Sequence, residues 1–453
     1  MERRGDSGLR PSLSRLRRTS AGAWLGLYLL LCVFPLILLL AGPIPDGGGR
    51  WWDFSMALGF SGLAMMGLQF ALTARFRRAT APFGIDIIYY FHRWAALGAF
   101  ALVLGHYAIL KTNYRESLGP LNPADADWPL TAGRLALAIF AVLIVSSVWR
   151  KQLRIEYDRW RFWHGILAAA GVMLAILHIQ GVGYYTRAPW KEAAWTCYSV
   201  MWLGLLFHIR VIKPWRLSRH PYRVVSVEEE RGDAWTVTVE PAGGEELRFH
   251  PGQFAWLTLG ASPFRAREHP FSFSGSASEP QRLQFTIKEL GDFTRTIRFV
   301  KAGEAAFVDG PHGSFTTDLY PNAPGFVLIA GGVGIAPIMS ILRTLAARRD
   351  ARPLILIYGN AHWDRVIFRE ALEELKKNLN LKVTHILQRP PPEWTGETGL
   401  ITREVLGRHL PDGARDWRFF LCGPVPMTRS VVGVLRGMGI PLRQIHSEHF
   451  DMA

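Results

Sequence analysis

The sequence predicts three parts in order: a membrane α-helical bundle of six spans, a small antiparallel β-barrel, and an α/β Rossmann-like domain. Six apolar segments follow one another in the first half of the 453-residue chain. Short β-like runs separated by Gly and Pro begin after Pro221, and from about Gly325 strands alternate with helices. We therefore divide the chain into residues 1–20, 21–212 (six helices), 218–320 (barrel) and 321–453 (α/β domain).

The six apolar segments have the length and composition of membrane spans. They are Ala21–Pro45, Phe54–Ala74, Ile87–Leu110, Leu135–Trp149, Phe162–Thr186 and Ala193–Ile209. Most can cross roughly 30 Å of hydrocarbon at a rise of about 1.5 Å per residue. The fourth and sixth are short, so we expect flanking residues such as Arg134 and Arg210 to reach toward the membrane interface. Buried helices of a soluble protein are a weak alternative for six segments in series.

The formal charge of +15 is concentrated in the apolar half of the chain. Residues 1–220 hold 25 Lys and Arg against 11 Asp and Glu, whereas residues 221–453 hold 27 against 26. This distribution argues against a nucleic-acid surface and is typical of membrane topology, in which basic loops stay in the cytoplasm. Basic and sparsely basic loops alternate, so both termini and the two C-terminal domains are expected in the cytoplasm. We expect a membrane of the bacterial inner type.

The cysteines exclude two kinds of metal centre. Cys32, Cys197 and Cys422 lie far apart in the sequence, with no CxxC spacing. Neither a zinc site nor a four-thiolate iron–sulfur cluster is therefore available, and a disulfide framework is not expected. The basic N-terminal segment shows no cleavage-site pattern, so the first span is expected to be retained.

Four histidines in the third and fifth segments form a repeated pattern. His92 and His106 are separated by 14 residues, and so are His164 and His178. Fourteen steps along an α-helix return to within roughly 40° of the starting face and rise about 21 Å. Both helices run in the same direction, so His92 is expected level with His164 and His106 level with His178. Facing imidazoles at two depths can hold two haems.

Ionisable residues inside a span are costly, so they are candidates for function. A single buried histidine could merely form a hydrogen bond to a neighbouring helix. The matching interval, direction and depth of all four favour the haem interpretation instead. His208, near the end of the sixth segment, has no such partner and is interpreted as structural.

Five short motifs follow one another in the C-terminal half. They are His269–Ser274 (HPFSFS), Gly291–Thr294 (GDFT), Asp309–Gly313 (DGPHG), Gly331–Pro337 (GGVGIAP) and Cys422–Pro424 (CGP). The second is expected to open a helix over residues 295–300, where free N–H groups can receive a pyrophosphate, and the third could be only a tight turn. The fourth follows a predicted strand and precedes a predicted helix, as a nucleotide-binding loop requires. Their order is more informative than any one alone.

In these motifs the chain resembles the NADPH oxidase and ferric reductase superfamily over about residues 54–453. Members join a six-helix bis-haem domain to a ferredoxin-reductase-like dehydrogenase. The resemblance implies that HPFSFS binds flavin, with His269 where soluble relatives carry Arg and Phe271 where they often carry Tyr. It also implies that Gly291–Thr294 holds the FAD pyrophosphate, with Phe293 where Trp is common.

The resemblance further implies that Gly331–Pro337 and Cys422–Pro424 bind the nicotinamide nucleotide, and that Phe450 lies near the flavin ring. Cys422 and Phe450 are the expected catalytic residues, and the four histidines the expected iron ligands. The expected cofactor-binding residues are His269, Pro270, Phe271, Ser272, Lys288, Gly291, Asp292, Phe293, Thr294, Gly331, Gly332, Gly334, Pro337, Arg365, Gly423 and Pro424.

These parts indicate electron transfer from a cytoplasmic nicotinamide nucleotide through FAD and two b-type haems to the opposite face. A nicotinamide releases two electrons as hydride and a haem accepts one, so a flavin is needed between them. The acceptor could be oxygen, a ferric chelate or a periplasmic redox protein, and the outer loop Lys111–Leu130 would discriminate among them. A non-redox six-span channel or scaffold with a vestigial reductase tail, and a reductase merely anchored by its helices, are the alternatives.

The loop after the second strand of the α/β domain bears on the choice of nucleotide. An acidic residue there would bind the ribose of NADH. Asp364, the only carboxylate in this loop, is expected instead to cap the helix over residues 365–377. His362, Arg365 and Arg389 could meet a 2'-phosphate, so we expect NADPH rather than NADH.

Overall fold

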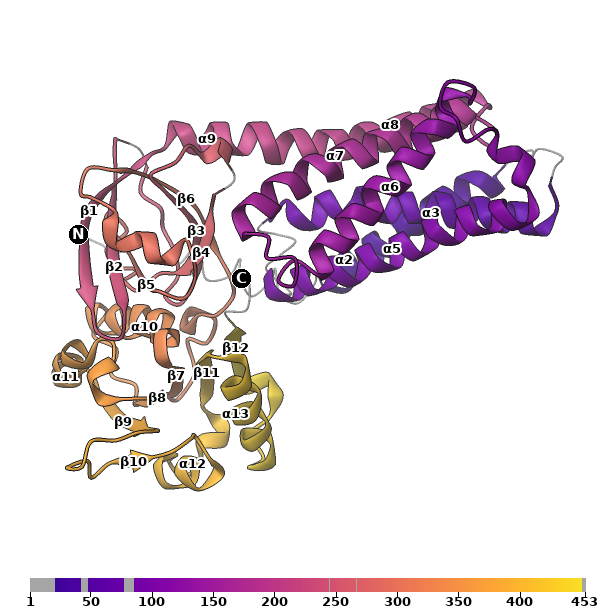
Figure 1. Cartoon of the computed structure of the whole chain (residues 1–453). Coiled ribbons are helices and arrows are strands. Elements are labelled where there is room, and N and C mark those ends of the chain that lie inside the picture. The colour runs from indigo at the N-terminus through magenta and orange to yellow at the C-terminus, as the bar shows by residue number, and fades with distance from the viewer. Residues whose placement is uncertain (1–20, 42–47, 77–84, 244, 266, 450–453) are drawn as a thin grey trace, which may run out of the picture. The chain divides into compact units, whose positions relative to one another are not determined.

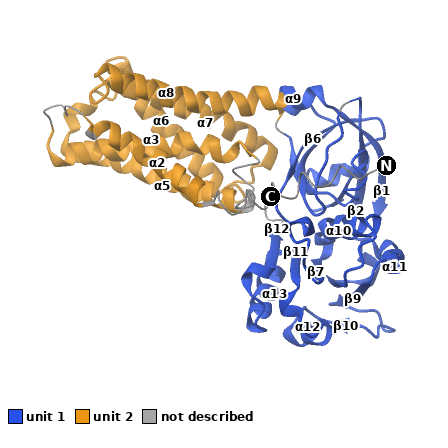
Figure 2. Cartoon of the chain, turned by 180° about the vertical axis from the view of Figure 1, so that it is seen from behind, with its two compact units in different colours: residues 1–15, 215–263, 267–453 blue, residues 16–214, 264–266 orange. Residues whose placement is uncertain are grey.

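The structure is a computed structural model that describes residues 21–41, 48–76, 85–243, 245–265 and 267–449 (Figure 1). The N-terminal segment 1–20 and Phe450 lie outside these residues. The chain divides into two compact units (Figure 2). One contains residues 16–214 and 264–266, and the other is formed mainly by residues 215–263 and 267–453. Each unit is described by itself.

The first unit is a helical bundle, and within its described residues six helices are long and apolar enough to cross a membrane. They are α2 (Ala21–Leu40), α3 (Arg50–Thr73), α5 (Ile85–Asn113), α6 (Trp128–Val148), α7 (Tyr157–Val182) and α8 (Pro189–Phe207). Two of their contacts depend on glycine: a Cβ at Gly62 would meet Val103 of α5, and one at Gly67 would meet the ring of Trp202. Small residues let helices approach closely in a membrane, where burial alone gives little driving force. The predicted six-span bundle is confirmed.

The fourth and sixth spans are longer than the apolar segments suggested. Helix α6 begins at Trp128, and Arg134 in its second turn donates hydrogen bonds to the carbonyl groups of Leu118, Gly119 and Pro120. Arg134 therefore fastens the preceding loop, which includes the 3-10 helix η1 (Arg115–Leu118). Helix α8 continues through a π-helical turn, η2 (His208–Ile212), into α9 (Lys213–Arg219).

The second unit begins with a curled antiparallel sheet. Its strands are β1 (Tyr222–Glu230), β2 (Ala234–Pro241), β3 (Phe254–Leu259), β4 (His269–Ser272), β5 (Leu283–Lys288) and β6 (Ala305–His312), in the order β4-β3-β6-β1-β2-β5. A bridge between Phe273 and Phe285 joins the two ends of the sheet, as expected for the predicted barrel. Strand β6 includes most of the DGPHG motif and pairs with β3. The motif is thus largely part of a strand, and the alternative of only a tight turn does not hold, because Gly and Pro can also stand at strand irregularities.

A parallel sheet with helices follows. Its elements are β7 (Phe326–Gly331), α10 (Ile335–Ala347), β8 (Leu354–Asn360), α11 (Arg369–Asn378), β9 (Leu381–Leu387), β10 (Glu397–Thr398), α12 (Arg403–His409), β11 (Arg418–Gly423), α13 (Val425–Gly437) and β12 (Ile445–His449). The strand order is β10-β9-β8-β7-β11-β12. The alternating pattern of strands and helices predicted this doubly wound sheet, which the structure confirms. The edge strands β10 and β12 were not predicted.

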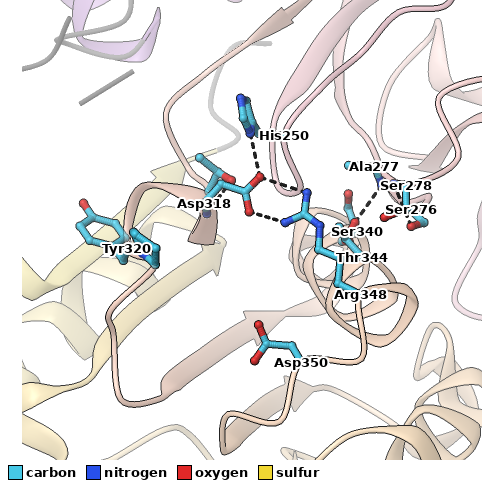
Figure 3. A network of polar contacts seen from close by, with 12 residues as sticks. His250, Ser276, Ala277, Ser278, Asp318, Tyr320, Ser340, Thr344, Arg348 and Asp350 are labelled. Carbon is cyan, nitrogen blue, oxygen red and sulfur yellow. Dashed lines mark hydrogen bonds and ion pairs between the residues drawn. The ribbon is translucent and has the colours of Figure 1, made fainter. Parts of the chain in front are cut away.

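A polar network joins α10 to the barrel within the second unit (Figure 3). Asp318, in the 3-10 helix η5 (Thr317–Leu319), accepts hydrogen bonds from His250 Nδ1 at 2.8 Å and Arg348 Nη1 at 2.5 Å. Thr344 Oγ1 accepts the N–H of Ala277 at 2.8 Å. Burial alone would raise the pKa of Asp318, but the hydrogen bonds and charges of His250 and Arg348 outweigh it and lower the pKa to about 2. The carboxylate is therefore ionised and tightly held.

Candidate functional site

The four histidines of the bundle lie on two of its helices. His92 and His106 lie on α5, and His164 and His178 lie on α7. His92 is a near neighbour of His164, and His106 of His178. The structure thus brings together the histidines that were expected at the same level of the two helices.

Hydrogen bonds at Nδ1 orient three of these rings. His106 Nδ1 lies 2.9 Å from the carbonyl oxygen of Ser55, and His178 Nδ1 lies 2.9 Å from that of Pro129. His164 Nδ1 is 3.4 Å from the hydroxyl oxygen of Ser147. A proton on Nδ1 satisfies a carbonyl and leaves Nε2 as the nitrogen available to a metal, which is the usual arrangement of a ligating histidine.

His92 is the exception among the four. Its Nδ1 is buried and has no hydrogen-bond partner among the residues that the structure describes. The ring is therefore not fixed by a neighbour in the way that the other three are.

Two glycines make room for the rings of the second pair. A Cβ at Gly133 of α6 would lie 2.7 Å from His178 Nδ1, and one at Gly59 of α3 would lie 3.1 Å from the ring of His106. Any larger residue would push the imidazole aside. Sequence reasoning missed both glycines, although each lies in an apolar segment where glycine lowers helix propensity and so needs another reason.

The ligand set fits a haem better than a bare ion. Within the described ranges there is no group of three or more His, Cys, Asp or Glu that could hold a metal ion. Two imidazoles facing each other suffice only for a metal that brings its equatorial ligands with it, as haem iron does. Both histidine pairs therefore meet this test for b-type haem.

The HPFSFS motif forms strand β4 and the residues after it. Phe271 pairs with Ala255 and Ser272 with Phe254 on β3. The ring of His269 stacks on Phe293 at 3.8 Å between centroids. The hydroxyl of Ser272 is buried, with no hydrogen-bond partner in the part of the chain that is described. Burying a hydroxyl group without a hydrogen-bond partner costs free energy. This atom therefore indicates a polar ligand at β4, such as a flavin.

The predicted helix over residues 295–300 is a 3-10 helix, η4 (Thr294–Phe299). Thr294 Oγ1 accepts hydrogen bonds from the N–H groups of Leu290 at 2.8 Å and Gly291 at 2.9 Å. The amide of Gly291 is therefore already used in this conformation. The role expected of Gly291–Thr294 in pyrophosphate binding stays a prediction. Lys288, at the end of β5, is half-buried nearby in sequence.

The glycine-rich loop and the CGP motif interlock at the carboxyl ends of β7 and β11. Gly331 ends β7, Gly332–Gly334 forms the short 3-10 helix η6, and α10 follows with Pro337 in its first turn. A Cβ at Gly334 would collide with the carbonyl oxygen of Cys422. One at Gly423 would lie 3.0 Å from the amide nitrogen of Gly331. Ligands of open α/β sheets bind at this edge, and Pro424 leads from it into α13.

Glu448 was not singled out from the sequence, but it lies beside Cys422. The two residues are paired in the register of β11 and β12. Burial, and then the charge of Glu448, raise the pKa of the Cys422 thiol, which therefore stays protonated. A Cβ at Gly313 would lie 3.0 Å from Glu448 Oε1, so the DGPHG segment reaches the same place. In the sequence, the only signal for Glu448 was its position two residues before Phe450.

The residues expected to distinguish NADPH from NADH follow strands β8 and β9. Arg365 Nη1 lies 3.4 Å from Asp233 Oδ2, and both side chains are more than half exposed. The N–H of Arg389 bonds to the carbonyl of Ala361 at 2.9 Å, which joins the two loops. The expected capping role of Asp364 was wrong. It lies in the 3-10 helix η7 (Trp363–Arg365), and α11 begins only at Arg369, after Phe368 in a left-handed conformation.

Comparisons with known families cover both halves of the chain. Residues 58–175 match the ferric reductase like transmembrane component, and residues 328–433 match the oxidoreductase NAD-binding domain. The chain is 32% identical over 158 residues to NADH-cytochrome b5 reductase 1 of Debaryomyces hansenii, covering 33% of this chain and 54% of that protein. It is 30% identical over 179 residues to the Arabidopsis thaliana protein of that name, covering 38% and 62%. The chain thus spans about half the length of these curated relatives.

Two solved structures are also similar to the chain. The flavohemoglobin of Malassezia yamatoensis has a TM-score of 0.48 at 18% identity, covering 89% of this chain and 99% of that one. The ferredoxin reductase in carbazole 1,9a-dioxygenase has a TM-score of 0.45 at 24% identity, covering 51% and 69%.

The membrane bundle, the reductase-type unit and the two family matches define an integral membrane oxidoreductase. More particularly, the chain joins a ferric-reductase-like transmembrane domain to an oxidoreductase NAD-binding domain, a fusion that fits the NADPH oxidase and ferric reductase superfamily.

Proposed function

We propose that this protein transfers electrons from cytoplasmic NAD(P)H, by way of FAD and two b-type haems, to an acceptor on the opposite face of the membrane. The observation that carries the proposal is the pair of facing histidine sets on α5 and α7, within a bundle that matches a ferric reductase component. Oxygen, giving superoxide, and ferric chelates are the proposed acceptors. A periplasmic redox protein is the second candidate, because His106 and His178 would together hold the outer haem, which would then reduce its acceptor without coordinating it.

The reductase unit supplies the nucleotide and flavin sites. FAD, when bound, accepts hydride and releases electrons singly, which links a nicotinamide to a haem. Ser272 and residues 292–294 would hold it, while the loop Gly331–Pro337 would receive the nucleotide phosphates through its backbone. Cys422 stays a neutral thiol and Glu448 an adjacent carboxylate, so together they would bound the nicotinamide pocket without forming a covalent bond to it.

The bundle would supply the haem sites. Haem iron, when bound, takes up and releases one electron. His92 and His164 would hold the inner haem, and His106 and His178 the outer one. The hydrogen bonds from Nδ1 to Ser55 and Pro129 fix the tautomer of the outer pair and make Nε2 a better donor to iron.

The outer loop is the proposed place of acceptor selection. Arg134 ties Leu118–Pro120 to α6 one residue from Gly133, against which His178 packs. The loop is thereby held close to the outer pair. The excess of basic residues at alternate loops supports cytoplasmic termini and a bacterial inner membrane.

The nucleotide is proposed to be NADPH, with NADH as the alternative. The exposed guanidinium of Arg365 beside the loop that follows β8 supports a 2'-phosphate site. Both similar cytochrome b5 reductases are named for NADH, which supports the alternative.

A reduced-minus-oxidised spectrum of the purified protein, with NADPH as reductant, tests the function. Two haems and nucleotide-dependent haem reduction are expected. His92→Ala or His164→Ala should leave flavin reduction intact and abolish haem reduction. An absent haem spectrum would favour the channel or the anchored reductase.

The outer pair gives a second, distinct outcome. His106→Ala or His178→Ala should still allow the inner haem to be reduced, while transfer to the external acceptor stops. His220→Ala, an exposed histidine outside both pairs, is the matched control and should change neither step. Full turnover in either outer variant would remove the assignment of that pair.

A further inference from the structure

The sixth span contains a local irregularity at one position. Between α8 and α9 the backbone forms a π-helical turn at His208–Ile212, so the span runs continuously from Pro189 to Arg219. A π-helical turn accommodates an additional residue, which rotates the side chains within it relative to a regular α-helix. Such turns are found mainly as single features inside α-helices, and frequently at functional sites. Arg210 lies in the middle of this one.

Arg210 does not simply extend away from the bundle, as its position at the end of an apolar segment suggested. A Cβ at Gly165 of α7 would collide with the Nη2 atom of its guanidinium. Gly165 directly follows His164 in the sequence. The packing therefore places the guanidinium at the turn of α7 that carries His164. Only glycine at position 165 leaves space for it.

We infer that Arg210 is a positioning residue for the inner haem, binding a propionate of the haem that His92 and His164 would hold and stabilising its reduced iron. The inference rests on the proposed function. A guanidinium suits a carboxylate geometrically, since two parallel N–H groups can donate to its two oxygens. A fixed positive charge beside a redox centre also favours the state with one more electron. Arg210 would therefore make the inner haem a better acceptor.

Midpoint potentials of the two haems, measured by spectroelectrochemical titration of the purified full chain, test this inference. Arg210→Gln should lower the equilibrium constant for reducing the inner haem by on the order of tenfold, as expected for loss of one nearby charge. A tenfold change corresponds to about 59 mV for a one-electron couple. The outer haem should keep its potential. Arg210→Lys should recover much of the change, because it retains the charge without the paired donors.

A second variant moves the guanidinium without removing it. Gly165→Ala should shift the inner potential in the same direction as Arg210→Gln, because the added methyl group displaces the side chain. Two controls match these changes. Gly204→Ala adds a methyl group on α8 where nothing lies within 4 Å, and Arg216→Gln removes an exposed charge from α9. Neither should alter either potential.

The outcomes separate this inference from the proposed function. Selective loss of the inner haem in Arg210→Gln, with retention in Arg210→Lys, would support the binding role. Unchanged potentials in Arg210→Gln with two haems present, an equal shift of both, or loss of both haems together would overturn the inference. Absence of haem from the wild type would instead overturn the proposed function.

Discussion

Replacing Asp318 by Asn is expected to destabilise the reductase unit by about 2 kcal/mol at pH 7. The carboxylate binds His250 from the barrel and Arg348 from the end of α10, with only 8% of its side chain exposed (Figure 3). Its pKa falls from an ordinary value of 3.8 to about 2. At about 1.36 kcal/mol per unit, that difference gives the expected magnitude. In a unit of this size it corresponds to a decrease in Tm of roughly 4–8 °C.

The effect of pH follows from the direction of the shift. Because the pKa of Asp318 is lower in the folded protein, its stabilisation is fully present above about pH 4. It is lost as pH falls from about 4 toward about 2. The difference in Tm between wild type and Asp318→Asn should therefore be constant from pH 7 to 5 and shrink below pH 4. Thermal unfolding of the purified full chain, followed by intrinsic fluorescence, measures it.

Glu374→Gln is the control for removing an ion pair. Glu374 and Lys377 lie 2.6 Å apart, but their side chains are 63% and 70% exposed. Such an exposed pair contributes little to stability, so Tm should hardly change. A Tm of Asp318→Asn within 1 °C of wild type at pH 7, or a difference at pH 3 as large as the difference at pH 7, would refute the reasoning about the network.

Three further predictions concern the reductase chemistry. Gly334→Ala should slow nucleotide-dependent flavin reduction at least about tenfold in stopped-flow measurements, because its Cβ would collide with β11 and a misplaced loop loses phosphate contacts. Gly433→Ala, where nothing lies within 4 Å, should not. Truncation after Glu448 should alter hydride transfer more than haem content. Normal nucleotide kinetics in the truncated protein would show that Phe450 contributes only to packing. Steady-state kinetics should favour NADPH over NADH, with the preference weakened by Arg365→Ala or Arg389→Ala. A wild type that prefers NADH would contradict this.

Local patterns in the sequence were sufficient for the architecture. Six apolar segments, a change to short strands after Pro221 and the strand–helix alternation after Gly325 predicted the bundle, the curled sheet and the doubly wound domain. They succeeded because burial in lipid or in a core acts on every residue of a segment and leaves a periodic composition. The 14-residue interval between histidines could be interpreted in the same way. Helix geometry alone places His92 and His106 on nearly the same face of one helix, and His164 and His178 on nearly the same face of another.

Elements whose signals are short or mixed could not be predicted in this way. Strand β6 contains Gly310 and Pro311, which favour a turn when considered alone, and β12 is recognised only by pairing with β11. Asp364 has the residue type of a helix cap, but the chain continues through a 3-10 turn before α11 begins. For the two strands, pairing with a distant segment outweighed the local preference.

The sequence by itself determined which residues are available and how they repeat along each helix and strand. Only the tertiary structure decided what lies beside them: Gly133 against His178, Glu448 beside Cys422, and Arg210 at the turn that carries His164. The physical reason is that helical and strand periods depend on bonds between near neighbours. Contacts across elements depend instead on packing of the whole chain, to which a single glycine or a π-helical turn contributes no periodic signal.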